Sequence, residues 1–375
     1  MMKNLSYLLA LHSIEGLGSV RLKMLLDYFE DPKLAWEASK KEWESLRLQR
    51  RVIEGWINVR KKLDPEDYLQ RILKSGVGIL TFFDPDYPAL LKQIYDAPLI
   101  LYFKGNKKIL NQKSIGVVGT RQVTGYGRAV TEKLTQELVE ARLVIVSGLA
   151  RGVDSIAHRT VIDNGGLTVA VLGAGLNNIY PPENLRLSQE IIDKGGVVLC
   201  ENPPDYLIVP GVFPSRNRII SGLSLGVLVT EAAKDSGSLI TARFALEQGR
   251  EVFAVPGPIT SYFSAGPANL IKEGAKLVTS AEDILSELGI GANKRVTLSA
   301  SEESSFSDLE KQILKFLENE QKHIDEISKK LNKPSSEVSA SLIKLEIQGI
   351  IKSLGGGVYI KSFPAEKIGF SKSSS

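Results

Sequence analysis

The sequence predicts an α/β protein built on a doubly wound sheet, with a small all-α region before the sheet and a winged helix after it. Three observations support this fold class. Short apolar runs alternate with amphipathic stretches in residues 76–288, helical spacing dominates residues 1–75, and residues 306–363 contain three helical patterns followed by two short strands. At 375 residues the chain is longer than one hydrophobic core usually organises, so several domains are expected.

Residues 1–75 are predicted to form a helical domain of the helix-hairpin-helix or SAM-like kind. Apolar residues recur there mostly at three- and four-residue steps. Gly16 and Gly18 separate two helical patterns and permit a tight hairpin, whose amides could hold a phosphate at the start of the next helix. A plain turn between two helices needs the same glycines, so contact with DNA and a purely structural turn both remain open.

Residues 76–288 are predicted to form an extended Rossmann-like domain. Nearly continuous apolar strands separated by helices indicate a parallel sheet that is covered on both faces. The six strands expected in this alternation are residues 114–118, 143–146, 168–172, 197–200, 227–230 and 251–255. Two further β-type runs, residues 78–83 and 99–103, precede them.

The C-terminal part is predicted to contain a linker, a winged helix and a disordered tail. Residues 289–305 are rich in glycine and serine, and residues 364–375 end in a serine-rich tail. Ser307 and Glu310 have the spacing of a capping box that opens the first of three helices in the winged helix, residues 306–363. That unit carries nine lysines against eight acids, which favours a protein-contact or regulatory role over the reading of duplex DNA.

Composition narrows the class of protein. The 47 basic residues exceed the 43 acidic ones by four, which is compatible with a nucleic-acid partner but too small an excess to indicate one. A single cysteine, Cys200, cannot form an internal disulfide, and with three histidines in the chain a zinc site is not expected. The apolar runs are too short to span a bilayer, and no signal peptide or bound cofactor is expected. These observations predict a cytoplasmic protein without a membrane partner.

The loops that follow the predicted strands indicate an anion site. In a doubly wound sheet the ligand lies beyond the carboxyl ends of the strands. Glycines, small hydroxyl residues and arginines stand there, and the candidate DNA-binding residues among them are Gly119, Thr120, Arg121, Ser147, Gly148, Arg151, Arg216, Asn217, Arg218, Gly237 and Ser238. Amides at helix N-termini and guanidinium groups together suit phosphate oxygens.

Known catalytic patterns are absent from these loops. The first loop lacks the glycine spacing of a dinucleotide site, and no P-loop sequence occurs in the chain. Asp154 and His158 would share a helix face, either as an acid-base pair or as a helix-capping acid and an unrelated buried histidine. We therefore expect no enzyme, although a nucleotide hydrolase or phosphoribohydrolase that uses Glu201 or Glu231 is the alternative. A second alternative is a structural adaptor protein whose sheet binds no ligand.

The ordered motifs resemble the DprA (Smf) family of DNA-processing proteins. They are Gly119-Thr120-Arg121, Ser147-Gly148 with Asp154 and His158, Gly173-x-Gly175, Tyr180-Pro181, Phe213-Pro214-x-Arg216-Asn217-Arg218 and Gly237-Ser238-Leu239. The resemblance is strong over residues 78–285, and family members also carry the terminal units. One departure is that Val209-Pro210-Gly211-Val212 precedes Phe213, where members often have histidine or lysine, so one contact to the DNA backbone is either missing or supplied by another residue.

The resemblance implies a homodimer that binds single-stranded DNA and loads the RecA recombinase during natural transformation. It also implies that the phosphate pocket consists of Gly119, Thr120 and Arg121 together with Arg216, Asn217 and Arg218, lined by Ser147 and Gly148. Bases of the strand could stack on Tyr126, Tyr180 or Phe213, although an aromatic ring in such a position is more often part of the core.

Overall fold

The computed structural model describes residues 3–209, 211–290, 307–317, 322–347 and 351–361. The chain divides into two compact units, Met1–Gly291 and Ala292–Ser375. Residues 291–305 of the predicted linker and the whole predicted tail, residues 364–375, lie outside the described residues.

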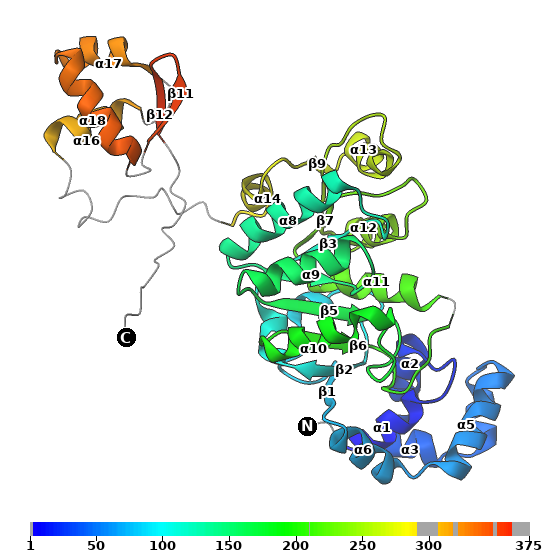
Figure 1. Cartoon of the computed structure of the whole chain (residues 1–375). Coiled ribbons are helices and arrows are strands. Elements are labelled where there is room, and N and C mark those ends of the chain that lie inside the picture. Colours follow the sequence, from blue (N-terminus) through cyan, green and yellow to red (C-terminus); the bar gives the residue numbers. More distant parts are fainter. Residues whose placement is uncertain (1–2, 210, 291–306, 318–321, 348–350, 362–375) are drawn as a thin grey trace. The chain divides into compact units, whose positions relative to one another are not determined.

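The N-terminal region is helical, as predicted (Figure 1). Its helices are α1 (Leu5–His12), α2 (Ser19–Phe29), α3 (Pro32–Glu37), α4 (Lys40–Ser45), α5 (Arg50–Lys62) and α6 (Pro65–Lys74). Asp31 and Asp64 start α3 and α6, where each side chain accepts hydrogen bonds from backbone amides and a proline occupies the first helical position. Gly16, with φ +81°, makes the turn between α1 and α2.

A nine-stranded sheet forms the centre of the first unit. Its strands are β1 (Gly78–Thr81), β2 (Ile100–Gly105), β3 (Ser114–Val118), β4 (Val144–Ser147), β5 (Thr168–Leu172), β6 (Val197–Cys200), β7 (Gly226–Val229), β8 (Glu251–Ala254) and β9 (Lys276–Leu277). Their order across the sheet is β1-β2-β6-β5-β4-β3-β7-β8-β9. All six strands expected in the alternating region are present within one residue of the predicted bounds, so the predicted fold class is confirmed.

The sheet is mixed rather than wholly parallel. Strands β3 to β9 pair in parallel, whereas β2 pairs with β6, and β1 with β2, in antiparallel fashion. No long crossover helix separates β1 from β2, and only the short helix α7 (Ala89–Lys92) lies between them. Parallel neighbours need a long crossover, so these two strands extend the sheet in antiparallel fashion at the β6 side.

Helices cover both faces of the sheet. They are α8 (Gly125–Glu140), α9 (Val153–Asp163), α10 (Leu185–Asp193), α11 (Val212–Leu223), α12 (Ser238–Glu247), α13 (Ala265–Lys272) and α14 (Ala281–Glu287). Helices α8, α9 and α14 share one apolar core with Ile115 and Val117 of β3, and α11, α12 and α13 share another with Val118. The residues of β3 therefore alternate between two cores, as they must in a sheet buried on both sides.

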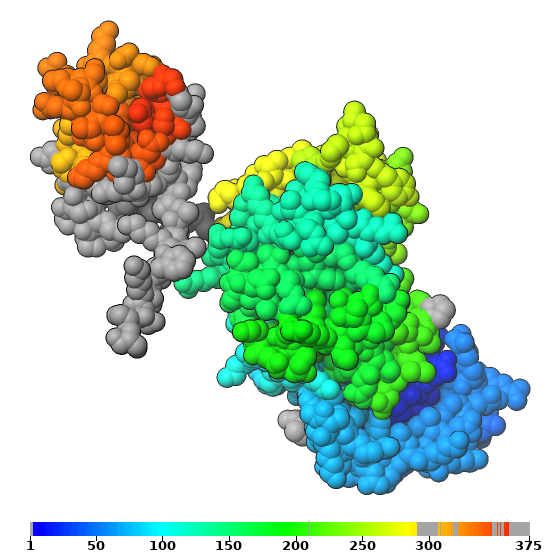
Figure 2. Space-filling view, in the orientation of Figure 1, coloured from blue at the N-terminus to red at the C-terminus, as the bar shows by residue number. Residues whose placement is uncertain are grey.

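The helical region and the sheet share a third core. Leu8 and Leu25 of the helices belong to one apolar cluster with Tyr102 of β2, Leu172 of β5 and Ile191 of α10. In the space-filling view the blue helical region and the green sheet region meet over a continuous surface (Figure 2). The helical region is thus fixed to the β2–β6 side of the sheet by apolar burial.

The second unit has the winged-helix arrangement. It contains α16 (Asp308–Phe316), α17 (Ile324–Leu331) and α18 (Ser335–Ile347), with a three-stranded sheet of β10 (Lys322–His323), β12 (Val358–Lys361) and β11 (Ile351–Gly355). Ser307 and Glu310 form the predicted capping box at the start of α16. Its core is one apolar cluster that includes Ile313, Ile327 and Leu342 from the three helices.

Candidate nucleic-acid interface

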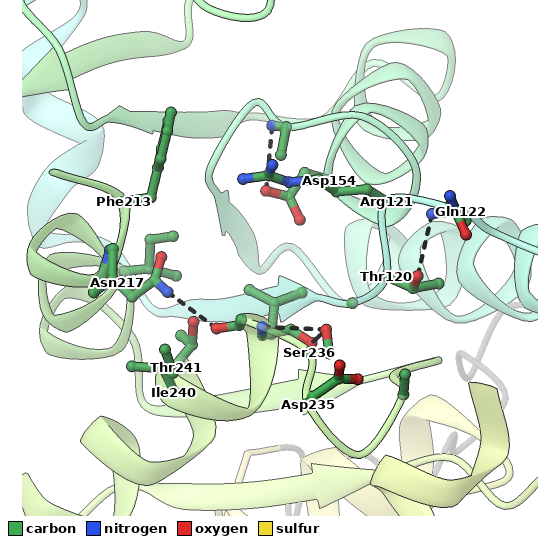
Figure 3. A pocket seen from close by; sticks show the side chains of 18 of the residues that line it. Thr120, Arg121, Gln122, Asp154, Phe213, Asn217, Asp235, Ser236, Ile240 and Thr241 are labelled. Carbon is green, nitrogen blue, oxygen red and sulfur yellow. Dashed lines mark hydrogen bonds between the residues drawn. The ribbon is translucent and has the colours of Figure 1, made fainter. Parts of the chain in front are cut away.

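A pocket of about 560 Å³ lies beyond the carboxyl ends of the parallel strands (Figure 3). Its wall is built from the loop after β3, the start of α9, the first half of α11, the turn before α12 and the loop after β8. We call it the strand-end pocket; its polar lining residues are Thr120, Arg121, Gln122, Asp154, Arg216, Asn217, Asp235, Ser236, Ser238, Thr241 and Tyr262. The pocket lies where a doubly wound sheet places its ligand.

Two glycines allow the loops to approach one another closely. A Cβ on Gly148 would lie 2.4 Å from Nη1 of Arg216, and a Cβ on Gly152 would lie 2.3 Å from the carbonyl oxygen of Thr120. Gly152 also has φ +74°, which side chains other than glycine seldom adopt. The glycines after β4 are therefore required by packing as well as by turn geometry.

Arg216 is a fixed, buried cation at the base of this site. It is 6% exposed, and Nη1 donates hydrogen bonds to the carbonyl oxygens of Gly148 and Val171. Burial lowers the pKa of Arg216 to about 10, while the charge of Asp154 works in the opposite direction. The side chain thus stays protonated at neutral pH and ties α11 to the ends of β4 and β5.

Asp154 is the buried counter-charge of this arrangement. Its Oδ2 accepts hydrogen bonds from the amides of Gly148 at 3.1 Å and Ala150 at 3.3 Å. Burial raises the pKa of Asp154, and Arg216 and the two amides oppose that rise. Asp154 therefore holds the loop after β4 in shape, as a helix N-terminal acid does.

Arg121 differs from Arg216 because its charge is available. The guanidinium carbon lies 5.4 Å from the centre of the Phe213 ring, and Arg121 makes no ion pair or hydrogen bond within the described part of the chain. The loop that carries it is held by Thr120, whose amide donates to the carbonyl oxygen of Glu231 at 2.7 Å. An exposed arginine on a fixed loop is suited to contact a phosphate.

A shallow cleft adjoins the strand-end pocket and shares Arg121, Ala150, Phe213 and Arg216 with it. Gly148, Arg151, Tyr180 and Pro181 complete its lining. The rings of Tyr180 and Phe213 are 5.8 Å apart and inclined by 43°. Arg151 is exposed at the rim and is paired with Glu183. Aromatic rings beside arginines are the chemistry that bases and phosphates of a single strand need.

The start of α12 supplies the opposite wall of the pocket. The side-chain amide of Asn217 donates to the carbonyl oxygen of Gly237 at 3.2 Å, which joins α11 to the turn before α12 (Figure 3). Ser236 and Ser238 share a hydrogen bond of 2.8 Å between their hydroxyl oxygens. The first amides of α12 already have acceptors. The Ser238 amide donates to the Ser236 hydroxyl at 3.4 Å, and the amides of Leu239 and Ile240 donate to the carbonyl oxygens of Ser236 at 3.0 Å and Gly237 at 3.2 Å.

Two predicted site residues lie elsewhere. Arg218 points away from the strand-end pocket: its Nε lies 3.1 Å from Asp96, and its Nη2 lies 2.5 Å from Glu201. Two residues on a helix are about 200° apart around the axis, so Arg216 and Arg218 cannot both face one pocket. Ser147 is fully buried and donates to the carbonyl oxygen of Val117 at 2.6 Å. Its hydroxyl stabilises the sheet and lines neither hollow.

The other predicted site residues do come together. Gly119, Thr120, Arg121, Arg216, Asn217, Gly237 and Ser238 line the strand-end pocket, and Gly148 and Arg151 line the adjoining cleft. Sequence reasoning missed Gln122, Asp235, Tyr262 and Phe263, which also line the pocket. The loop after β8, which carries Tyr262, follows a parallel strand as the other site loops do, and that position is the signal that could have identified it.

The carboxylates of the hydrolase alternative are committed to structural roles. Glu231 accepts hydrogen bonds from the amide of Thr124 at 3.0 Å and from its hydroxyl at 2.6 Å, at the start of α8. Glu201 accepts from Ser19 and Arg218. Neither lines the strand-end pocket or the adjoining cleft. Asp154 and Asp235 are the acids that line the strand-end pocket, and both accept hydrogen bonds there.

Asp154 and His158 do not pair with one another through a hydrogen bond. Nδ1 of His158 lies 2.7 Å from the hydroxyl of Thr168, and burial lowers the pKa of this histidine to about 3. Cys200 is buried in β6, where burial raises the pKa of its thiol. In the part of the chain that the structure describes, no cluster of acids, histidines or cysteines could hold a metal ion. Within those same ranges, no helix is both long enough and apolar enough to span a membrane.

Comparison with known proteins shows which family the chain is similar to. A family model described as DNA recombination-mediator protein A matches residues 78–289, and one described as the DprA winged helix domain matches residues 298–357. DNA processing protein DprA of Bacillus subtilis is 47% identical over 216 residues, which are 57% of this chain and 72% of that protein. Protein Smf of Escherichia coli is 41% identical over 279 residues, 72% of this chain and 74% of that protein.

Two solved structures are similar to this fold. DNA processing protein A from Streptococcus pneumoniae aligns with a TM-score of 0.66 and 38% identity, over 76% of this chain and 98% of that one. The Helicobacter pylori structure, which concerns that protein's single-stranded DNA binding mode, aligns with a TM-score of 0.51 and 30% identity, over 56% of this chain and 95% of that one. The resemblance in the sequence motifs is confirmed: the chain belongs to the DNA recombination-mediator protein A family, whose relatives are named DprA or Smf.

Proposed function

We propose that the protein binds single-stranded DNA along the carboxyl ends of its parallel strands and mediates recombination of that DNA during uptake and natural transformation. The observation that carries this proposal is Arg121 in the strand-end pocket, a cation over the Phe213 ring that has no ion pair among the residues the structure describes. Phosphates would contact the arginine, and bases would stack near Phe213 and Tyr180. The Helicobacter pylori relative, with its single-stranded DNA binding mode, supports the same ligand.

A single strand fits these features better than a duplex does. Bases in a duplex are already stacked on each other, whereas the partly buried rings of Phe213 and Tyr180 beside Arg121 can only be used by unpaired bases. The winged helix offers little net attraction for a duplex, because its nine lysines are nearly balanced by eight acids, as where Lys344 of α18 is paired with Glu310 at 2.8 Å. For the winged helix we propose a protein-contact or regulatory role.

The remaining parts of the proposal follow from family membership. We propose a cytoplasmic homodimer that delivers the bound strand to a RecA-type recombinase, without catalysis of its own. Residues 76–288 would be the DNA-binding domain, with residues 1–75, 289–305, 306–363 and 364–375 as the helical domain, linker, winged helix and tail. Light scattering of the purified chain tests the dimer, and recombinase filament assembly on coated single strands tests the delivery. Nucleotide turnover that is lost in Glu231→Gln would instead favour the hydrolase.

Fluorescence anisotropy with labelled oligonucleotides tests the binding proposal. Single and double strands of equal length are compared at four salt concentrations. If each protomer neutralises roughly three to five phosphates, log K for the single strand falls with log salt at a slope of about −2 to −3.5. Tighter binding to the single strand at every salt concentration supports the proposal. Equal or tighter binding to the duplex, or no binding, refutes it.

A further inference from the structure

The positive charge of the chain is concentrated in one segment of the helical region. Residues 40–62, which form α4, α5 and the turn between them, hold eight basic and three acidic residues. This local excess is larger than the formal net charge of the whole chain, which is +4, so the remaining residues are together slightly acidic. All eight basic side chains are exposed. A local excess of this kind attracts anions.

Four of these cations lie along the solvent-facing side of α5. The other side of this helix packs into the apolar core of the helical region. Arg50 and Lys61 are 11 residues apart, as are Arg51 and Lys62, and 11 residues make about three helical turns, so each pair shares one side of the helix. Figure 1 shows α5 at the outer edge of the helical region, away from the sheet. We call Arg50, Arg51, Lys61 and Lys62 the α5 basic face.

Three of the four charges on this face are uncompensated. Arg50 is paired with Glu54, the single acid of α5, at 2.7 Å. Arg51, Lys61 and Lys62 make no ion pair with any residue that the structure describes. Exposed cations without a partner keep their full attraction for an incoming anion, because no existing ion pair has to be broken first.

The stability of the helix does not explain the arginines at the start of α5. Cations near a helix N-terminus oppose the macrodipole, whereas acids there stabilise the helix. Arg50 and Arg51 are the first two residues of α5, and no acid occupies its first turn. The Nε of Arg51 donates to the neutral side chain of Gln49 at 2.9 Å, which leaves its charge uncompensated. The face therefore carries positive charge at both ends of the helix and not only at the C-terminal end, where the dipole favours it.

The surroundings of the α5 basic face set the class of partner. No large apolar side chain of residues 40–62 is exposed, and the indole rings of Trp43 and Trp56 are buried. The face therefore offers charge without rings on which unpaired bases could stack. Such a surface suits a rigid partner with closely repeated anions. Double-stranded DNA carries about one negative charge per 1.7 Å of its axis, and α5, with 13 residues, is about 20 Å long.

We propose that the α5 basic face binds the phosphate backbone of double-stranded DNA, independently of its sequence. The face shares no residue with the strand-end pocket, and it does not include the glycine hairpin of residues 16–18. The protein thus has separate surfaces for an unpaired strand and for a duplex. Duplex binding is the weaker of the two, because the face supplies few cations and no stacking. The duplex site itself does not depend on the proposed function.

The decisive variant is Arg51→Gln/Lys61→Gln/Lys62→Gln, which we call the α5 variant. Glutamine has a helix propensity close to that of lysine and arginine. The loss of Arg51 from the first turn stabilises α5 and offsets part of what the loss of the two lysines from the last turn costs. The melting temperature should therefore stay within about 2 °C of that of the unaltered chain. Lys62→Gln alone, which leaves the start of α5 untouched, is the second variant.

Lys108→Gln/Lys113→Gln/Lys194→Gln is the matched control. The three lysines are exposed, lie outside the helical region and do not line the strand-end pocket. The control removes the same number of positive charges with the same replacement. Any general effect of lost positive charge on DNA affinity then appears in both triple variants.

Anisotropy of a labelled blunt-ended duplex is measured at four salt concentrations with the full-length proteins. At low salt the α5 variant should bind the duplex about 5- to 50-fold more weakly than the control. The magnitude of its salt slope should be smaller by about 1.8 to 2.7, for two or three lost phosphate contacts, and that of Lys62→Gln by about 0.9. A short labelled oligothymidylate should bind the two triple variants equally, and an excess of it should not release the duplex from the unaltered chain.

Each contrary outcome overturns a stated part of the proposal. Equal duplex affinity and equal salt slope in the α5 variant and the control overturn the site itself. An equal loss of duplex and oligothymidylate binding in the α5 variant overturns the assignment to a duplex, and release of the duplex by oligothymidylate overturns the separation of the two surfaces. Binding of a labelled glutamate-rich peptide that is lost in the α5 variant, with unchanged duplex affinity, would assign the face to an acidic protein instead.

Discussion

Replacement of Arg121 by alanine should separate DNA binding from folding. Arg121 is exposed and makes no ion pair within the described ranges, so its removal breaks no contact that holds the loop. Its guanidinium already lies 5.4 Å from the centre of the Phe213 ring, so little side-chain freedom is lost when a phosphate binds. By contrast, Arg151 must first leave Glu183, and that exchange offsets part of what it gains from DNA.

The magnitude follows from one charge-assisted phosphate contact. Such a contact contributes about 1.5–3 kcal/mol. We take the lower part of this range because the site is open to solvent, and about 1.5–2 kcal/mol corresponds to a 10- to 30-fold weaker single-strand affinity. One phosphate fewer also reduces the salt slope by about 0.7. The melting temperature should stay within about 2 °C of the unaltered chain, since surface substitutions seldom change stability by more than about 0.5 kcal/mol.

The assay is anisotropy of a labelled oligothymidylate at four salt concentrations, with thermal melting of the same samples. Arg142→Asn is the control, because Arg142 is exposed just before the amino end of β4 and has φ 61°, which asparagine tolerates. This control variant loses one positive charge, as Arg121→Ala does, but at the end of the sheet opposite the strand-end pocket. An Arg121→Ala protein whose affinity and salt slope equal those of Arg142→Asn would show that Arg121 contacts no phosphate, and the assignment of the pocket would be wrong.

Three further results are expected. Arg216→Ala should lower the free energy of unfolding by about 3–5 kcal/mol, because Asp154 loses its buried counter-charge; urea unfolding measures this, and an unchanged midpoint would contradict the positioning role. Glu183→Gln should free Arg151 and tighten single-strand binding about two- to fivefold at low salt, with the gain disappearing at high salt; a gain that persists at high salt would exclude this cause. Acid should destabilise the fold through His12 and His158, because burial lowers their pKa values from 6.5 to about 4 and about 3. As the pH falls, both histidines take up a proton in the unfolded chain but not in the folded one. The part of the free energy of unfolding that depends on these two neutral histidines is therefore fully present above pH 6.5 and is lost as the pH falls toward 4. Between pH 7 and 5 the free energy of unfolding should fall by about 2 kcal/mol for each histidine. In His158→Gln this fall should be about half as large as in the unaltered chain, and an equal fall in the two proteins would argue against this origin.

The sequence allowed the parallel part of the sheet to be predicted because each strand there is buried on both sides. Strands β3, β5 and β6 begin and end at the predicted residues, since runs such as Val197–Cys200 are apolar throughout and end at turn residues. The antiparallel pairing of β1 and β2 could not be read in the same way. Strand direction depends on the partner that a strand finds in space, and β2 pairs with β6, almost a hundred residues later.

The candidate site was predictable at the level of loops but not of every side chain. Arg121 and Arg216 follow from the rule that ligands lie beyond strand ends. Arg218 belongs to the same motif as Arg216. Only the orientation of α11 about its own axis, which the structure gives, shows that Arg218 faces Glu201 and not the strand-end pocket. Tyr262 follows a strand as well, but its loop contains no glycine-rich or arginine motif to mark it.

A crystal structure of the full chain with a short oligothymidylate tests the central claim most directly. The strand should lie across the carboxyl ends of β3, β4 and β7, with a phosphate oxygen within hydrogen-bond distance of the Arg121 guanidinium. A strand bound only to the winged helix, with the strand-end pocket free of nucleotide, would contradict the claim.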